Sequence, residues 1–547
     1  MSFKLNVYLC HNLRLLMPTH CISFRDTNYF SKFICDYLDE LPELKPLYNR
    51  FPNLENFKAQ IEEKKQTIKS DSRITLVNVL KEQYQHVETS DLTLQNIKSL
   101  KSESTFTITT GHQLNLFTGP LYFLHKIVST INLTKALKET YPSFNFVPVF
   151  WMASEDHDFD EINYFNFNGK KIQWNREDGG PVGRFNTKGL DAVLDIVSLE
   201  FGSGKHADQL KIWFKEAYFN HNNLTDATRY LANVLFAEYG LVVIDADHSE
   251  LKRLFMPQLK QELSEKTGFN TVSKTNAILE SLNYNIQVNP RKINLFYIKD
   301  NLRERIVSDG DTFKVNNTDI SWNTHEILEE LEQSPERFSP NVIMRPLYQE
   351  VILPNLCYIG GGGELAYWFQ LKSNFEAQNV TFPILLLRNS VLLKTAKQNY
   401  KQERLGISDR DLFLKRNSFI NKRVRQISNI DINFSEQIDH LQKQFAKLYN
   451  LAQETDKSFI GAVKAQEMKQ IKGLQHLEKR LLKAQKRKLA DQIARVTELQ
   501  EQLFPGASLQ ERNTNFSELY LEFGDTLISE LVKSLEPLRG EFTIITM

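Results

Sequence analysis

The stretch TFTITTGHQLNLFTGPLYFLHKI, residues 105–127, decides the fold together with VPVFWMASEDHDFDE, residues 147–161. The first six residues of the first stretch are rich in β-branched side chains, which is typical of a buried strand. The pattern that follows predicts a helix over about 121–139 and a second strand over 147–152. A strand, a loop, a helix and a strand in this order predict the βαβ unit of a parallel sheet.

Polar residues follow both predicted strands. Parallel sheets bind ligands beyond the carboxyl ends of their strands, so we expect the two polar clusters to face one crevice. Taken singly, each acid has an ordinary alternative as part of a solvated loop or as a helix cap. The clusters are Gly111, His112 and Gln113 after the first strand, and Glu155, Asp156, His157 and Asp158 after the second.

The composition is that of an ordinary globular protein of 547 residues, long enough for several domains. Lys+Arg and Asp+Glu both number 67, so no global field favours nucleic acid or a membrane. No apolar run approaches the roughly 20 residues that span a bilayer. Four cysteines in so long a chain do not make a disulfide framework, which predicts a reducing cytoplasm. Residues 1–16 make a poor signal peptide, and our hypothesis is that the protein starts at Met17.

Later in the chain, four consecutive glycines at 360–363 follow a predicted strand at 355–359 and precede an apolar helix. Such a run lets a backbone approach a ligand closely, although a flexible turn is the alternative. A further predicted strand over 382–387 ends in Arg388. This places a cation suited to a carboxylate or a phosphate at the same edge of the sheet.

The chain divides into four expected parts. They are a helical part of the core at 17–104; a Rossmann-like core at 105–390, with an inserted segment at about 162–335 that includes a small β-meander at 293–318; a helical region at 391–510, with an antiparallel coiled coil at about 434–504; and a helical tail at 511–547 that packs on the core.

The predicted coiled coil has two arms of unequal length. The second arm continues for several turns beyond the first, so we expect its tip to lack a partner within the chain. An unpaired apolar stripe is usually buried in an oligomer. The pattern therefore predicts a homodimer through these arms.

Together these motifs resemble the cysteine-adding ligases of bacillithiol biosynthesis. The matching motifs are TGHQ at 110–113, FTGPLY at 117–122, HKI at 125–127, PVFW at 148–151 and EDHDFDE at 155–161. A later set, from Ser339 to Lys372, matches as well. The resemblance extends from about Met17 to the C-terminus.

The resemblance implies an α/β fold with a Rossmann-like core, similar to the nucleotidyltransferase-like core of class I aminoacyl-tRNA synthetases. It also implies an inserted connecting subdomain and a C-terminal coiled coil that mediates dimerisation. The implied reaction joins the carboxylate of L-cysteine to the amine of glucosaminyl-malate. ATP or another nucleotide, with Mg²⁺, is expected to activate the carboxylate, and no tightly bound metal is expected.

The resemblance also implies roles for particular residues. The expected catalytic residues are His112, Gln113, His125, Lys126, Glu155, Asp156, His157 and Asp158. Among them, His125 and Lys126 would stabilise phosphate charge, the acids would hold Mg²⁺ or an ammonium group, and His157 would take a proton from the attacking amine. Arg345 or Arg388 would bind the malate carboxylates. The expected binding residues are Gly111, Thr118, Gly119, Trp151, Ser339, Arg345, Gln349, Gly360, Gly361, Glu364, Gln370, Lys372, Arg388, Arg512 and Asn515.

Two other readings stay open at this point. One is a metal-dependent hydrolase with His112, His157 and the neighbouring acids as ligands, since zinc accepts such nitrogen and oxygen donors. The other is a non-catalytic coiled-coil scaffold that keeps a nucleotide-binding core.

Overall fold

The computed structural model describes residues 19–176, 179–299, 301–455 and 457–547. The expected N-terminal extension therefore lies outside the described residues. The chain forms two compact units, one comprising residues up to Leu393 together with Leu509–Met547, the other comprising Lys394–Ser508. Within the described ranges, no helix is both long and apolar enough to cross a membrane.

A five-stranded parallel sheet lies at the centre of the first unit, so the predicted Rossmann-like α/β fold is confirmed. Its strands lie in the order β13-β12-β2-β3-β6, and each neighbouring pair is parallel. The strand order reverses between β2 and β12, the place where such folds bind ligands. The strands are β2 (Thr105–His112), β3 (Asn145–Met152), β6 (Val242–Asp245), β12 (Asn355–Gly360) and β13 (Ile384–Leu387).

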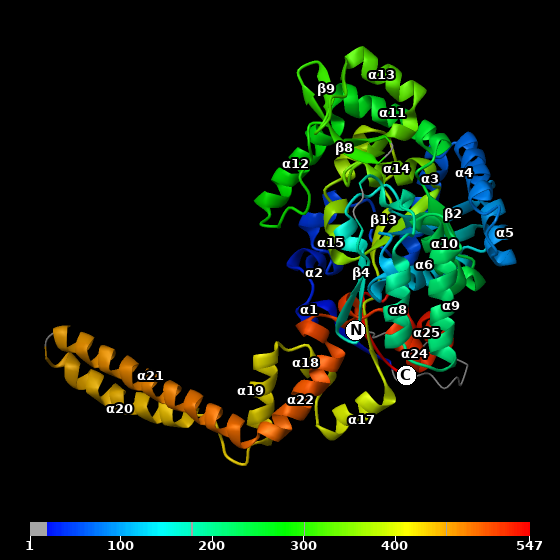
Figure 1. Cartoon of the computed structure of the whole chain (residues 1–547). Coiled ribbons are helices and arrows are strands. Elements are labelled where there is room, and N and C mark those ends of the chain that lie inside the picture. The colour runs from blue at the N-terminus through cyan, green and yellow to red at the C-terminus, as the bar shows by residue number, and fades with distance from the viewer. Residues whose placement is uncertain (1–18, 177–178, 300, 456) are drawn as a thin grey trace, which may run out of the picture. The chain divides into compact units, whose positions relative to one another are not determined.

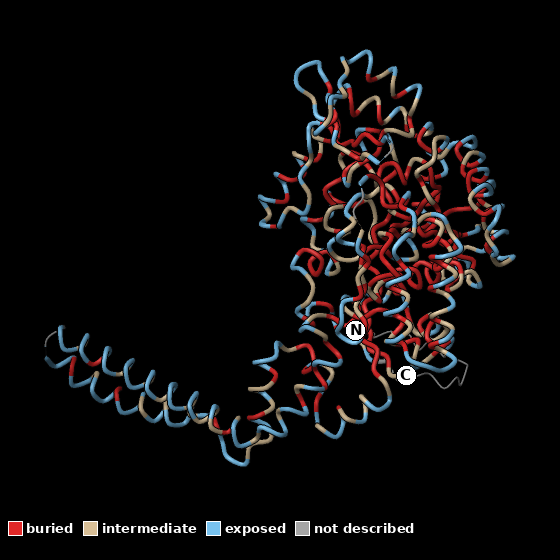
Figure 2. Tube along the Cα trace, in the orientation of Figure 1, coloured by how far each residue is buried: buried red, intermediate tan, exposed pale blue. Residues whose placement is uncertain are grey.

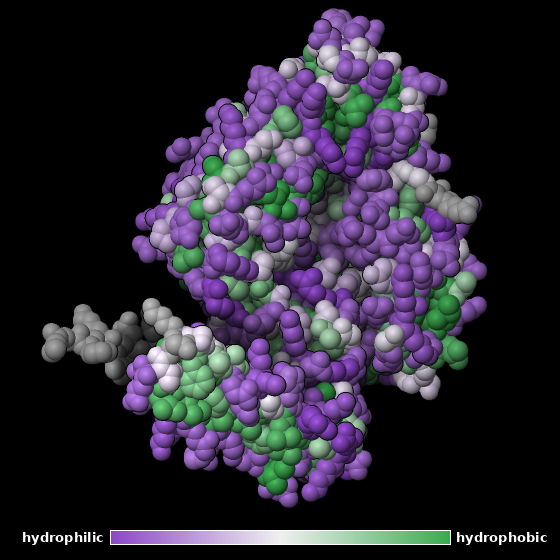
Figure 3. Space-filling model, turned by 90° about the vertical axis from the view of Figure 1, so that its left-hand side faces the viewer, coloured by the Kyte–Doolittle hydropathy of each residue, from purple (hydrophilic) through white to green (hydrophobic). Residues whose placement is uncertain are grey.

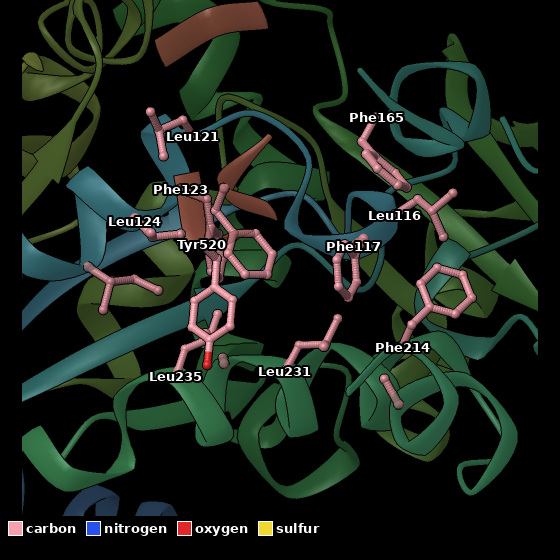
Figure 4. Close-up of a cluster of buried hydrophobic side chains, with 14 of the residues drawn as sticks. Leu116, Phe117, Leu121, Phe123, Leu124, Phe165, Phe214, Leu231, Leu235 and Tyr520 are labelled. Carbon is pink, nitrogen blue, oxygen red and sulfur yellow. The ribbon is translucent and has the colours of Figure 1, made fainter. Parts of the chain in front are cut away.

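Helices cover this sheet because their apolar side chains pack against the apolar side chains of its strands. Helix α6 (Tyr122–Thr140) connects β2 to β3 and is buried along most of its length. Its Phe123 belongs to a large hydrophobic cluster with Leu231 of α10 (Leu224–Phe236) and Tyr520 of α24 (Phe516–Phe523), shown in Figure 4. The C-terminal tail therefore packs on the core. This unit also contains the N-terminal helices α2 (Lys32–Leu38), α3 (Leu54–Thr67), α4 (Ser70–Gln83) and α5 (Asp91–Ser99).

Strand β6 corrects the expected inserted segment at about 162–335. Its short Val-Val-Ile run is buried and pairs with β3, so it is the edge strand of the central sheet. The inserted material is therefore split in two. The first part carries α8 (Leu190–Glu200), α9 (Lys205–Phe219) and α10, and the second begins with α11 (Ser249–Glu265) and α12 (Thr267–Ser281).

The second part of the insertion contains an antiparallel sheet with more strands than the expected meander at 293–318. The strand order is β10-β9-β8-β7-β11, and Figure 1 shows β8 and β9 near helices α11 and α13 (Thr324–Gln333). The strands are β7 (Leu295–Lys299), β8 (Leu302–Asp309), β9 (Thr312–Val315), β10 (Ser321–Asn323) and β11 (Phe338–Pro340).

A third sheet corrects the expectation that the two ends of the chain are purely helical. Strand β15 (Glu541–Thr546) pairs with β1 (Thr19–Ser23), and the sheet order is β1-β15-β14, with β14 at Val391–Lys394. Beside it, the side chain of Gln510 bonds the backbone of Leu393 twice, at 2.9 Å from Leu393 N and 3.1 Å to Leu393 O. The segments that precede and follow the second unit are thus held together.

The second unit contains the expected helical hairpin, α20 (Ser435–Gln453) and α21 (Lys457–Lys488), followed by α22 (Ala490–Leu503). Asp456, at the expected reversal, lies outside the described residues. Figure 2 shows the hairpin exposed over most of its length. Phe445 and Ala452 of α20 and Val463 of α21 form a small buried cluster. The extra length of α21 lies at the end opposite the turn of the hairpin. There Glu478 pairs with Arg425 of α19 (Arg416–Ile427) at 2.6 Å. The prediction that the end of the longer arm lacks a partner within the chain is therefore wrong.

Candidate functional site

A cavity of about 730 Å³ opens at the carboxyl edge of the parallel sheet, within the size range of small-molecule sites. The ends of β2, β3 and β12 form one wall, and residues of the antiparallel sheet and of the segment 287–291 form the other. Figure 3 shows that the face turned to the left of Figure 1, where α12 and α15 (Gly362–Trp368) lie, is hollowed and largely hydrophilic.

The two polar clusters meet in this cavity, as the sequence predicted. The Gln113 amide, just after β2, donates to Asp156 Oδ2 at 3.1 Å and to Glu161 Oε2 at 2.8 Å. Gly111, His112, Trp151, Glu155 and His157 also line the cavity, which brings together the ends of two neighbouring strands.

His112 forms a buried part of the wall. Its ring packs edge-on to Tyr122 at 5.4 Å and against Phe123 at 5.4 Å. Burial lowers the pKa of His112 well below its usual range, and the charge of Lys126 acts in the same direction. Among the described residues, the buried Nε2 atom has no hydrogen-bond partner. A buried polar atom left in this way on a cavity wall can bond a ligand.

Lys126 ties the end of β2 to the start of α15. Its Nζ donates to Gly111 O at 2.7 Å and pairs with Glu364 Oε1 at 2.5 Å. Glu364 Oε2 in turn accepts from Tyr358 Oη at 2.9 Å. Burial lowers the pKa of Lys126, and the carboxylate of Glu364 opposes this shift.

Three carboxylates of the acidic segment after β3 have different surroundings. Burial raises the pKa of Asp156, but hydrogen bonds from His157 and Gln113 and the charge of Arg303 outweigh it and bring the pKa well below its usual range. Burial raises the pKa of Glu155, which pairs with Lys252. Asp158 does not line the cavity; it accepts from Glu161 N at 3.3 Å and caps α7 (Phe159–Ile162). The expected ligand role of Asp158 is therefore corrected to a helix cap.

His157 contacts an arginine that the sequence analysis missed. Arg303 of β8 places Nη1 2.6 Å from His157 Nδ1. Because a guanidinium has only donors, Nδ1 accepts this hydrogen bond. Both groups pack on the ring of Phe296, and Ser339 Oγ accepts from Arg303 Nε at 3.2 Å. Ser339, an expected binding residue, is fully buried and acts through Arg303.

Arg345, at the start of α14 (Arg345–Ile352), is a cation that lines the cavity beside the ends of β3 and β12. The rings of Trp151, Tyr358 and Trp368 surround its guanidinium at 5.6–5.9 Å. Nη1 donates to Gln349 Oε1 at 3.1 Å, so Gln349, buried and away from the cavity, orients Arg345. Among the described residues, no carboxylate lies within ion-pair distance of Arg345.

Two expected site residues belong to a buried cluster outside the cavity, which we call the Glu511 clasp: His125, Arg388 and Glu511. Arg388 binds Glu511 with both terminal nitrogens, at 2.8 and 3.0 Å, and His125 Nδ1 lies 3.1 Å from Glu511 Oε2. The expectation that His125 contacts phosphate and Arg388 contacts a carboxylate ligand is therefore wrong. The carboxylate that both residues bind comes from the chain itself.

The tail residues also act on structure and not on the cavity. Asn515 is fully buried and donates to Phe117 O at 2.9 Å and Gly119 O at 2.6 Å. It thereby braces a loop in which Thr118 and Gly119 have positive φ, 67° and 65°. Arg512 is exposed and does not line the cavity. The expected ligand contacts of Asn515, Arg512 and Thr118 are corrected accordingly.

The remaining residues of the later block support the cavity from behind. Gln370 Oε1 accepts from Gln287 N at 3.0 Å and Val288 N at 3.1 Å, which fixes part of the far wall. Gly361 N donates to Glu364 Oε1 at 3.4 Å, and Gly360 has no room for a Cβ beside the Tyr358 ring. Lys372 pairs with Glu376 on the surface, so its expected ligand contact is wrong.

Several cavity residues were not predicted. They include Tyr122, Glu161, Arg291, Phe296, Arg303, Arg305, Asn341, Tyr358 and Tyr367. One signal was available, because arginines two residues apart on a strand, such as Arg303 and Arg305, share a face. In the described part of the chain, no three His, Cys, Asp or Glu side chains are arranged to hold a metal ion. The metal ligands that the hypothesis of a metal-dependent hydrolase requires are therefore not brought together there.

Comparison with known proteins connects this architecture to one family. A solved structure named as a "putative arginyl t-RNA synthetase" from Campylobacter jejuni matches 82% of this chain and 97% of its own, at 10% identity and a TM-score of 0.19. A protein named "Putative cysteine ligase BshC" from Flavobacterium johnsoniae is 61% identical over 97% of this chain and 100% of its own length. Another of that name, from Christiangramia forsetii, is 58% identical over 97% and 99%.

Family profiles cover both parts of the chain. Residues 17–389 match "Bacillithiol biosynthesis BshC, N-terminal Rossmann-like domain", and residues 391–547 match the C-terminal coiled-coil domain of the same family. These matches agree with the parallel sheet and the helical hairpin described above. The chain therefore belongs to the BshC family of bacillithiol biosynthesis, an enzyme family whose members are named cysteine ligases.

Proposed function

We propose that the chain joins the carboxylate of L-cysteine to the amine of glucosaminyl-malate and so forms bacillithiol. The family and the names of its members support this reaction. The observation that carries the proposal is a cavity lined by both carboxylates and arginines, at the switch point of a Rossmann-like sheet.

The charges of this cavity fit the two substrates. Both bring an ammonium group, which Asp156 and Glu161 are placed to bind. Glucosaminyl-malate also brings carboxylates, which suit the guanidinium of Arg345 because planar, two-point bonds form between these groups. Arg291 and Arg305 line the same cavity and add positive charge there.

Amide formation from a free carboxylate requires activation, and we propose that ATP or another nucleotide with Mg²⁺ supplies it. Gly111, His112 and Lys126 would contact phosphate, since they lie at the end of β2 and His112 Nε2 is unbonded among the described residues. Glu155 offers the oxygen ligands that Mg²⁺ prefers. The bound nucleotide supplies the leaving group, and the chain's own residues bind and orient both substrates.

The proposal is tested by incubating pure protein with L-cysteine, glucosaminyl-malate, ATP and Mg²⁺, with the thiol product followed by mass spectrometry. We expect product only when both substrates and a nucleotide are present. Cleavage of glucosaminyl-malate without cysteine, dependent on an added metal, would favour the hydrolase. Nucleotide binding without any turnover would favour the scaffold. The low cysteine content supports the cytoplasm as the place of reaction.

We further propose that the chain is a homodimer through the helical hairpin. Leu448 and Leu451 of α20 and Met468 and Leu477 of α21 are 41–52% exposed, an apolar surface that a second copy would cover. Sedimentation of the Leu451→Lys, Leu477→Lys double variant should show a monomer. Leu199→Lys, an equally apolar but more exposed position of the first unit, is the matched control and should leave the dimer intact. A double variant that sediments like the unchanged protein would contradict the proposal.

A further inference from the structure

His157 lies between two partners that compete for the same ring nitrogen. Arg303 Nη1 is 2.6 Å from Nδ1, and Asp156 Oδ1 is 3.6 Å from the same atom. The Arg303 bond requires a bare Nδ1, because arginine offers no acceptor. A bond to the Asp156 carboxylate would require a proton on Nδ1. The two contacts therefore select opposite tautomers of the imidazole.

We propose that Arg303 is a positioning residue that holds His157 in its Nε2–H tautomer, and that an anionic substrate group releases it. This inference rests on the proposed function and names a regulation of the same site. With Arg303 bound, the neutral ring can donate from Nε2 but cannot accept a proton there. It is therefore not a base toward a group in front of Nε2.

Arg303 is well placed to be recruited by an anion. It is 8% exposed, lines the cavity, and among the described residues has no carboxylate within ion-pair distance. Its other bonds, to Ser339 Oγ at 3.2 Å and Pro340 O at 3.4 Å, are to neutral groups. A bond from a guanidinium to a carboxylate or phosphate is stronger than one to a neutral imidazole. Glu155, Asp156 and Asp247 attract the same charge from beyond ion-pair distance, and an anion reaches Arg303 from the cavity that it lines.

The second partner is already fixed in place. Asp156 accepts from His157 N at 2.8 Å and from the Gln113 amide at 3.1 Å, so its carboxylate stays near Nδ1. When Arg303 turns to the anion, one proton leaves Nε2 and one binds Nδ1, which then donates to Asp156. The ring has the same number of protons, but its Nε2 lone pair is now exposed, as in other carboxylate–histidine pairs.

This change would couple substrate binding to base catalysis. The attacking amine forms its bond to the activated carboxyl carbon of cysteine, and the phosphate-bearing group departs with the electron pair of the broken bond. His157 Nε2 takes the proton that the amine loses, and Asp156 stabilises the resulting imidazolium. The base would thus form only when the anionic substrate is bound.

The tautomer is measured directly by long-range ¹H–¹⁵N correlation spectra of full-length protein labelled with ¹⁵N-histidine, with His157→Gln used for assignment. We expect the Nε2–H form in the protein alone and the Nδ1–H form after addition of L-malate, inorganic phosphate or ADP. The added compound that produces this change shows whether a carboxylate or a phosphate binds Arg303. An Nδ1–H form without ligand, or no response in any arm, overturns the inference.

Two variants separate positioning from folding. Arg303→Met removes the donor and should give the Nδ1–H form without ligand, whereas Arg303→Lys keeps a donor and should retain the Nε2–H form. In the ligase assay, we expect Arg303→Lys to raise KM about tenfold with little change in kcat. Asp156→Asn should lower kcat by at least about 10²-fold, because without the carboxylate His157 loses the tautomer that acts as the base. These spectra need no turnover, so a failed ligase assay and a failed tautomer response are separate results.

Discussion

Arg388 and Arg345 show how different the Glu511 clasp and the cavity are, although both arginines follow apolar segments at the same end of the sheet. Arg388 gives both terminal nitrogens to Glu511, which also accepts from His125 and from Val391 N at 3.0 Å. Arg345 contacts aromatic rings and one amide. The difference teaches that an arginine already bound to a carboxylate holds the fold, and one without such a partner is available to a ligand.

The largest effect is expected from breaking the clasp. Glu511→Ala leaves Arg388 buried without its counter-charge, and removing one member of a buried ion pair costs about 3–5 kcal/mol. All five tryptophans lie in the first unit, so urea unfolding followed by tryptophan fluorescence reports on that unit alone. The Arg388→Met, Glu511→Leu double variant is the control and should recover much of the loss. A loss below about 1 kcal/mol would remove the clasp from the account of stability.

The clasp also predicts a dependence on pH. Burial alone would raise the pKa of Glu511, but the charges and hydrogen bonds of Arg388 and His125 bring it well below its usual range. A carboxyl whose folded pKa is lowered stabilises the fold fully above its unfolded value of about 4.3. This stability is lost as the pH falls below that value toward the folded pKa. The Glu511→Gln variant should show a flatter decline of the unfolding midpoint between about pH 5 and pH 3.

A smaller effect is expected in the loop that Asn515 braces. Gly119 has a φ of 65°, and a Cβ added there would lie 2.5 Å from Asn115 Cβ. Gly119→Ala should therefore cost about 1–3 kcal/mol and lower activity, because this loop carries the chain from β2 into α6. Gly363→Ala is the matched control, since its Cβ would meet nothing within 4 Å and alanine favours helix α15. Equal unfolding midpoints for the two variants would contradict this view of the loop.

Arg345 should show the reverse of the clasp, with a loss of binding and little loss of stability. Arg345→Met removes a charged hydrogen bond to substrate worth about 1.5–3 kcal/mol, so we expect KM for glucosaminyl-malate to rise about 10–100-fold. The free energy of unfolding should fall by only about 1–2 kcal/mol, because contacts with the aromatic rings and hydrogen bonds to Gln349 and Tyr367 are lost but no ion pair is broken. A large loss of stability with an unchanged KM would place Arg345 with Arg388.

The smallest effect is expected at Arg305, an exposed cation on the cavity rim. Solvent screens such a charge, so Arg305→Gln should weaken substrate binding only about 2–5-fold. The difference from the unchanged protein should shrink further above about 0.5 M salt. Calorimetric titration at two salt concentrations measures it, and an effect that does not depend on salt would mean a direct contact.

The parts of the fold that were predicted from sequence are those that local spacing determines. Strands β2 and β3 and helix α6 follow from their apolar patterns, and the chain direction places Gln113 and Asp156 at one edge. Strand β6 has the apolar sequence of a buried strand, but its place in the sheet could not be predicted, because strand order is not encoded in a short segment. The long-range partners were missed for the same reason: Glu511 meets His125 across 386 residues, and Arg303 meets His157 across 146.

The two hydrogen bonds between the side chain of Gln510 and the backbone of Leu393 have a practical consequence. Since the two crossing points of the chain are side by side, a deletion of residues 394–508 closed by a few glycines should leave the first unit foldable. Such a shortened protein would separate chemistry from assembly: it should keep the cavity intact for soaking and titration, while any loss of turnover would measure what the helical hairpin contributes.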